Sequence, residues 1–247
     1  MSRIALFVTC VGDLITPDVP TAAVRVLRSA GDEVEVPAGQ TCCGQPAWNA
    51  GFAPEAASVA ETSLVALEQA LADGADAVVV PAGSCATMIR GYWPTLFEVA
   101  GRPELVERAR VLGERVRELT EWLVDQGRLP AGKAGPGTVA LQRSCHLERE
   151  LHIRTQPREL LERTGCELAE WPADDSCCGF GGTFSVKLPE VSVAMADEKL
   201  DALSDDVTEV VGTDASCLLQ LQGRARARGM DVRFRHIAEV LAEGLDA

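Results

Sequence analysis

Eight cysteines in this chain form two matching sets, and each set contains a Cys-Cys-Gly sequence. Cys10 precedes Cys42 by 32 positions, and the same interval separates Cys145 from Cys177. The first set consists of Cys10, Cys42, Cys43 and Cys85, and the second of Cys145, Cys177, Cys178 and Cys217. The equal spacing indicates an internal duplication in which both copies kept four thiols.

Four thiols per half are typical of metal ligation, thiol–disulfide chemistry or simple burial. Structural zinc sites normally use close Cys-x2-Cys pairs, which are absent from this sequence. Neighbouring side chains diverge in extended backbone, so adjacent thiolates suit the several metal atoms of an iron–sulfur cluster better than one ion. A disulfide between neighbours is strained, and it leaves two thiols per half unexplained. We therefore favour one cluster per half over zinc, redox-active disulfide or core cysteines.

Charge and hydropathy exclude several classes of protein. The formal net charge of −14 argues against a nucleic-acid partner, which requires a basic surface. No apolar run approaches 18 residues, so no transmembrane segment is expected. The apolar stretch at the start of the chain is too short for a signal peptide, so we expect a cytoplasmic protein. In that reducing compartment, cysteines act as ligands more often than as structural disulfides.

Short strands alternate with helices in both halves. This pattern predicts an α/β fold of two duplicated cysteine-rich domains, with mostly parallel sheets related by a pseudo-two-fold axis. The domains are expected at 1–130 and 138–247, joined by a linker at 131–137, and a single helix is expected over 104–125. Strands are expected just before Cys10, Cys85, Cys145 and Cys217. These thiols would then lie at the carboxyl ends of strands, where open α/β sheets bind ligands.

Four longer motifs carry a family resemblance. They are Gln40–Ala47 around the first Cys-Cys-Gly, Pro81–Ala86, Ser144–Leu147, and Cys177–Lys187. The chain resembles the lactate utilization protein A family of bacterial iron–sulfur proteins. That family belongs to the wider group with CCG domains, which includes the B-type subunit of heterodisulfide reductase and the iron–sulfur subunit of glycolate oxidase.

The resemblance implies that the eight paired cysteines are cluster ligands. It also implies an electron-transfer subunit of a complex that oxidises L-lactate to pyruvate, with further iron–sulfur proteins as partner subunits. The full CCG pattern ends each half in Cys-x2-Cys, but Met88 and Gln220 occupy the second of these positions here. Four ligands per half favour a [4Fe-4S] cluster over the unusual cluster of heterodisulfide reductase.

Other residues are weaker candidates. His146 follows a ligand and is a candidate for hydrogen bonding to a cluster or substrate, whereas His152 is expected to be structural. Arg143 is a candidate for binding a carboxylate or for an ion pair, and Lys187 for offsetting the charge of the second cluster. Cys166 has no counterpart in the first half and is expected to be a buried non-ligand.

The sequence thus predicts an iron–sulfur oxidoreductase subunit that acts in lactate oxidation with partner subunits. Clusters alone are poor acceptors for two electrons from a C–H bond, and no nicotinamide or flavin motif is visible, so the partners are expected to share the chemistry. Two alternatives remain open. One is a disulfide- or quinone-linked reductase subunit of the heterodisulfide reductase B type, and the other is a structural metal-binding protein.

Overall fold

The computed structural model describes residues 1–127 and 137–245 and contains two four-stranded parallel sheets. Sheet A has the order β2-β1-β3-β4, formed by Glu33–Glu35, Arg3–Leu6, Ala77–Val80 and Val116–Glu118. Sheet B has the order β6-β5-β7-β8, formed by Glu167–Ala169, Thr138–Gln142, Glu209–Gly212 and Arg233–His236. The identical order confirms the predicted fold of two duplicated α/β units. The predicted linker lies almost entirely outside the described residues.

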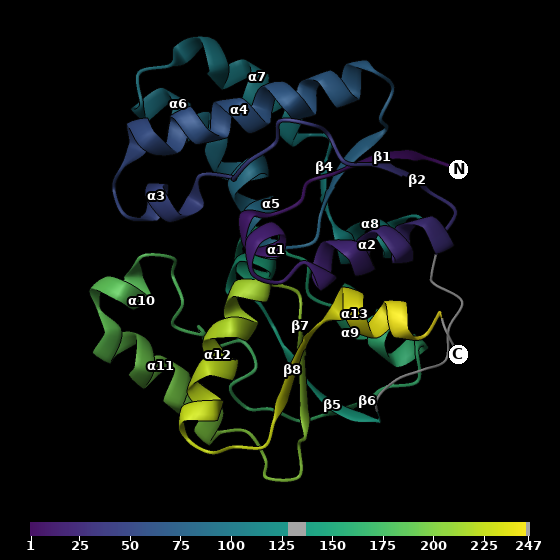
Figure 1. Ribbon diagram of the computed structural model, residues 1–247, viewed down its shortest axis with the longest axis vertical. Helices are drawn as coiled ribbons and strands as arrows, with labels where there is room; N and C mark the ends of the chain where they lie inside the picture. Colours follow the sequence, from purple (N-terminus) through teal and green to yellow (C-terminus); the bar gives the residue numbers. More distant parts are fainter. Residues whose placement is uncertain (128–136, 246–247) are drawn as a thin grey trace.

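Helices cover the sheets in three layers (Figure 1). The outer face of sheet A carries α4 (Ala53–Ala72), α6 (Trp93–Val99) and α7 (Pro103–Gly113). The outer face of sheet B carries α11 (Pro189–Asp201) and α12 (Ala215–Ala227). Between the sheets lie α2 (Asp18–Ser29), α8 (Leu119–Asp125), α9 (Gln156–Arg163) and α13 (Ile237–Glu243). The middle layer therefore joins the two halves through one shared core.

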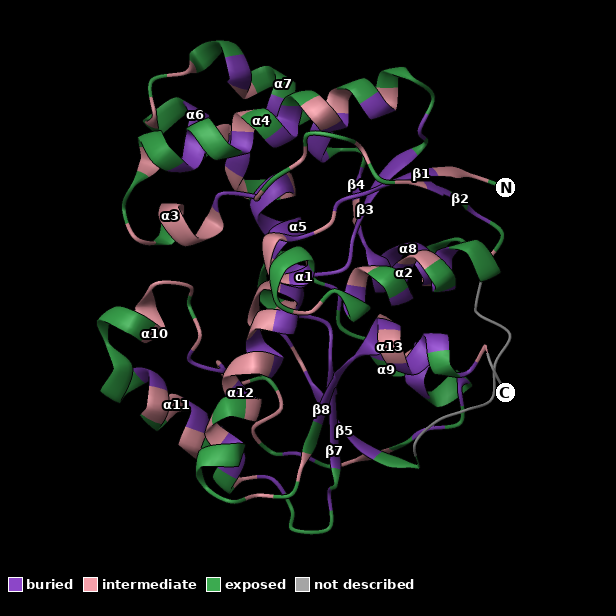
Figure 2. Cartoon of the chain, in the orientation of Figure 1, coloured by how far each residue is buried: buried purple, intermediate pink, exposed green. Residues whose placement is uncertain are grey.

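Strand β1 shows how the sequence creates these layers. Successive side chains of a strand point to opposite faces, so a strand buried on both sides is apolar throughout. Ile4 and Leu6 pack into the shared core, whereas Ala5 and Phe7 pack into the outer core against α4. All four side chains are fully buried, as the purple strands in Figure 2 show.

Six shorter helical segments connect these elements near the thiols. They are α1 (Cys10–Leu14), α3 (Gln45–Asn49), α5 (Gly83–Thr87), the π-helical turns η1 (Met88–Tyr92) and η2 (His146–Glu150), and α10 (Phe184–Lys187). Among the residues that the structure describes, no helix is both long and apolar enough to cross a membrane.

The prediction of one helix over 104–125 was wrong. Helix α7 ends at Gly113, and Val116–Glu118 forms the edge strand β4, which pairs with β3 before α8 begins at Leu119. The side chain of Glu118 accepts hydrogen bonds from the backbone N–H groups of Thr120 and Glu121, which starts the new helix. The local sequence pattern is helical, and Gly113 is its only residue that strongly disfavours a helix. Pairing with β3 therefore overrides the local helical preference.

Candidate metal centres

Three segments of the first half bring Cys10, Cys42, Cys43 and Cys85 together at the carboxyl end of sheet A. Cys10 opens α1 shortly after β1, Cys85 lies in α5 after β3, and the Cys-Cys pair lies between β2 and α3. The Sγ atoms of Cys42 and Cys10 are 3.4 Å apart, and those of Cys43 and Cys85 are also 3.4 Å apart. The thiols of Cys42 and Cys43 are also hydrogen-bonded to each other, so the four sulfur atoms form one contiguous group.

The second half repeats this arrangement with Cys145, Cys177, Cys178 and Cys217. Cys145 follows β5, the Cys-Cys pair follows β6, and Cys217 lies in α12 after β7. The Sγ atoms of Cys178 and Cys217 are 2.9 Å apart, and Cys177 is hydrogen-bonded to Cys145. All four cysteines line one hollow of about 80 Å³. Both predicted sets of thiols are therefore brought together by the fold.

The glycine after each Cys-Cys pair allows a close backbone approach. Gly44 and Gly179 have φ angles of 84° and 82°, a region that side chains disfavour. A Cβ atom on Gly44 would lie 2.8 Å from the Ala56 carbonyl oxygen, and one on Gly179 would lie 2.5 Å from that of Ser192. The turn needs glycine both for its backbone angle and for its contact with the following helix.

Hydrogen bonding and burial raise the pKa of some thiols in each set and lower that of others. Cys43 and Cys178 are only 2% and 3% exposed, and hydrogen bonds with neighbouring cysteines raise the pKa of both thiols, together with burial. Hydrogen bonds from Cys10 and Cys43 lower the pKa of Cys42 to about 3, and the Gly44 N–H also donates to its sulfur. Each set therefore favours a thiolate, the form that binds metals.

Each donor set consists of four thiols, which are ligands that iron–sulfur clusters and zinc both accept. Within the described ranges, no group of three or more His, Cys, Asp or Glu side chains converges closely enough to hold one metal ion. In both sets the two thiols of the Cys-Cys pair are hydrogen-bonded to each other, and each also contacts one further thiol of its set. The expectation that the side chains of adjacent cysteines diverge was therefore wrong for both pairs.

The two positions without a fifth thiol have structural roles. Met88 is fully buried in the outer core that contains Cys43 and Cys85. The Gln220 side chain donates to Ser192 Oγ at 2.8 Å, and Ser192 in turn donates to the Gly179 carbonyl at 2.7 Å. Met88 thus fills part of this buried core, and Gln220 supports the turn of the second set.

The hollow around the second set of thiols lies where the two halves of the chain meet. Besides the thiols, its lining includes Gln45, Pro46 and Ser84 of the first half. The side chain of Gln45 and the ring of His146 form a hydrogen bond of 3.2 Å, and the Ser84 N–H donates to Asp214 at 2.9 Å. The first half therefore helps to enclose the second set of thiols.

Comparison with known proteins decides the family. The family model described as a cysteine-rich CCG domain matches residues 4–90 and again 139–222. Lactate utilization protein A of an Exiguobacterium species is 42% identical over 99% of both chains. The chain belongs to the lactate utilization protein A family. Lactate utilization protein A 2 of Bacillus cereus strain Q1 is 36% identical over 98% of this chain and 99% of its own, and lactate utilization protein A 1 of Bacillus anthracis is 36% identical over 99% of both.

Solved structures resemble this family member only loosely. Glutamate racemase from Thermus thermophilus overlaps 99% of this chain and 78% of its own, with 14% identity and a TM-score of 0.35. The double match of the CCG domain agrees instead with the two copies of one sheet order. The resemblance predicted from the cysteine motifs is confirmed.

Of the weaker candidates, only His146 lies at a thiol site, with Nδ1 3.7 Å from Cys145 Sγ. Arg143 forms ion pairs with Glu148 and Asp174, at 3.0 and 2.8 Å, so its guanidinium is already engaged. His152 is exposed, and the Nζ atom of Lys187 lies 5.1 Å from the centre of the Phe52 ring.

Cys166 lies away from both thiol sets. It is 5% exposed within the shared core, where burial raises the pKa of its thiol. The prediction that Cys166 is buried is confirmed, and the prediction that it is not a ligand stays a prediction.

Lys199 was not predicted from the sequence to be of interest, yet it is fully buried beside the second site. Its position falls on the buried stripe of α11 with Ser192, Ala196 and Leu200. That spacing was the available signal, because a lysine on the apolar face of a helix must satisfy its charge inside the protein.

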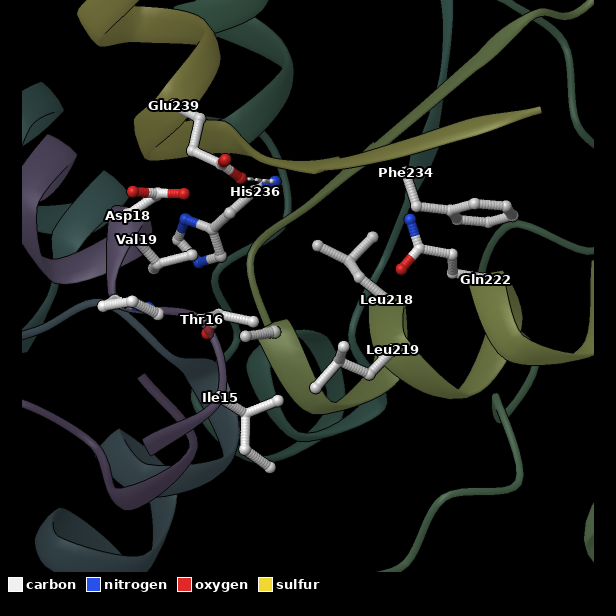
Figure 3. A pocket seen from close by; sticks show the side chains of 12 residues that line it. Ile15, Thr16, Asp18, Val19, Leu218, Leu219, Gln222, Phe234, His236 and Glu239 are labelled. Carbon is white, nitrogen blue, oxygen red and sulfur yellow. Dashed lines mark hydrogen bonds between the residues drawn. The ribbon is translucent and has the colours of Figure 1, made fainter. Parts of the chain in front are cut away.

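A separate hollow of about 180 Å³ lies between the halves on another side of α12 (Figure 3). Leu218 and Leu219 line it opposite His236 and Glu239, whose carboxylate accepts a hydrogen bond from the His236 backbone at 2.8 Å. None of its described lining residues is a cysteine. Helix α12 thus separates this hollow from the one that contains Cys217.

Proposed function

We propose that this chain is an iron–sulfur electron-transfer subunit of a complex that oxidises L-lactate to pyruvate. The observation that carries the proposal is the repeated set of four thiols, which the fold gathers at the carboxyl ends of two parallel sheets. The choice of L-lactate as substrate rests on the relatives, which are named for lactate utilization.

The eight paired cysteines would hold one [4Fe-4S] cluster in each half. Such clusters supply one-electron transfer when bound. The chain itself would contribute thiolates, a tight glycine turn after each Cys-Cys pair, and a hollow around the second set of thiols that both halves line. Partner subunits of the complex, among them other iron–sulfur proteins, would perform the C–H chemistry on lactate.

Growth of a deletion strain tests this function. Deleting the gene should abolish growth on L-lactate as sole carbon source and leave growth on pyruvate unchanged, because only the oxidation step is lost. The wild-type gene and the Cys166→Ser variant should restore growth, whereas Cys178→Ser should not. Normal growth of the deletion strain on L-lactate would refute the lactate role and favour another reductase function.

A further inference from the structure

A fully buried lysine lies beside the second set of thiols. Lys199 is 0% exposed, and its Nζ atom lies 2.6, 2.8 and 2.9 Å from the carbonyl oxygens of Ala173, Asp174 and Ser176. Three acceptors require three N–H groups, and among the forms of lysine only the ammonium has three. The Trp171 ring, with its centre 4.6 Å from Nζ, also stabilises the cation. Lys199 is therefore a positive charge inside the protein.

The equivalent residue of the first half is neutral. Ala56 and Ser192 correspond, because each carbonyl faces the glycine of its Cys-Cys-Gly turn. Ser63 and Lys199 follow them at the same interval and are both fully buried. Ser63 accepts a hydrogen bond from the Thr41 N–H at 3.0 Å and donates to the Cys42 carbonyl at 3.2 Å. Both residues hold the loop that leads into the Cys-Cys pair, but only Lys199 does so with a charge.

The charge lies close to the second set of thiols. The carbonyls that Lys199 binds belong to the loop that ends at Cys177. Burial lowers the pKa of Lys199 to about 8, while Cys178 and Cys217 act in the opposite direction, so the electrostatic coupling reaches these two cysteines. Charges interact more strongly in such a water-poor region than at the surface.

We propose that Lys199 is a positioning residue that raises the reduction potential of the second cluster relative to the same cluster without this charge. The inference rests on the proposed function, because it requires clusters in both halves. Reduction adds one electron to the cluster and makes it more negative by one charge. A fixed cation nearby stabilises that reduced state, since reduction potentials depend on the charge around a cluster.

Asp214 supplies a control of opposite sign. It is 2% exposed and accepts hydrogen bonds from the Ser84 N–H and the Ser216 hydroxyl. A hydrogen bond with Cys177 and burial raise the pKa of Cys145, and the negative charge of Asp214 adds to this rise. Ala82 holds the equivalent position in the first half, three residues before Cys85 as Asp214 is before Cys217. The second site therefore carries two buried charged residues whose equivalents in the first half, Ser63 and Ala82, are neutral.

An anaerobic redox titration with dithionite as electron donor, followed by EPR, tests the proposal on the complete protein. Iron and sulfide are measured in every variant, and the signal lost in Cys178→Ser identifies the second cluster. Lys199→Gln should lower the ratio of reduced to oxidised second cluster at least tenfold at a fixed potential, which is about 59 mV for one electron. Lys199→Arg should change it less than twofold. Asp214→Asn should shift it in the opposite direction, and the first cluster should stay unchanged.

A Lys199→Gln protein with full iron and an unmoved second potential would overturn the proposal, as would equal shifts of both clusters. If this variant loses the second cluster, Lys199→Arg decides. If Lys199→Arg keeps the second cluster at the wild-type potential, the result supports a role for the charge of Lys199. If Lys199→Arg also loses the cluster, Lys199 acts in loop folding alone. Wild-type protein without iron and sulfide would instead refute the proposed function itself.

Discussion

Replacement of Gly179 by alanine tests how the Cys-Cys-Gly turn creates a metal site. The new Cβ atom would lie 2.5 Å from the Ser192 carbonyl oxygen, and φ at this position is 82°. The left-handed backbone costs an alanine about 1–2 kcal/mol, and overpacking adds about 1–3 kcal/mol. We therefore expect the free energy of unfolding to fall by about 2–5 kcal/mol. Ser192 lies in α11, so relief of the clash would displace the turn that carries Cys177 and Cys178.

Gly165→Ala is the matched control. Its φ of 91° carries a similar backbone cost, but no atom lies within 4 Å of the added Cβ. The control should lose about 1–2 kcal/mol and keep its iron, whereas Gly179→Ala should lose the iron of the second site. Urea unfolding of the metal-free chains and iron analysis of the intact proteins measure both effects. Equal stability and equal iron in the two variants would refute the close approach as the reason for glycine.

Three further predictions concern ligands and buried charges. Cys178→Ser should reduce the iron content by about half while Cys166→Ser keeps all of it, and iron loss in Cys166→Ser would reveal a missed ligand. Burial lowers the pKa of His236 to about 4, so the unfolded chain binds this proton first as pH falls. The stability that neutral His236 contributes is therefore present above about pH 6.5 and falls by up to about 3 kcal/mol toward pH 4. His236→Asn, which can still cap α13, should make the free energy of unfolding depend less on pH in urea titrations of the metal-free chain. An unchanged pH dependence in this variant would contradict the prediction. Arg235→Met should cost about 3–5 kcal/mol in the same assay because it leaves Glu209, 8% exposed, without its ion-pair partner, and a change below about 1 kcal/mol would count against this pair.

The thiol sites could be predicted from the sequence because their information is local and repeated. Each Cys-Cys-Gly turn and each strand before a cysteine is encoded by a few consecutive residues, and the duplication supplied an internal check. By contrast, the three residues of β4 become a strand only by pairing with β3, which lies far away in sequence.

The importance of Lys199 could not be predicted in this way. Its acceptors are loop carbonyls more than twenty positions away in the chain, so only the folded structure identifies it as a buried cation. The shared middle layer was also missed, because helices such as α2 and α13 have an amphipathic pattern that does not say which half they cover. Tertiary packing, rather than local pattern, determined both features.

Iron and acid-labile sulfide per chain in anaerobically purified protein test the central claim most directly. Two four-iron clusters on the eight paired cysteines predict about eight iron and eight sulfide per chain. Colourless protein that contains zinc and no labile sulfide would contradict the account.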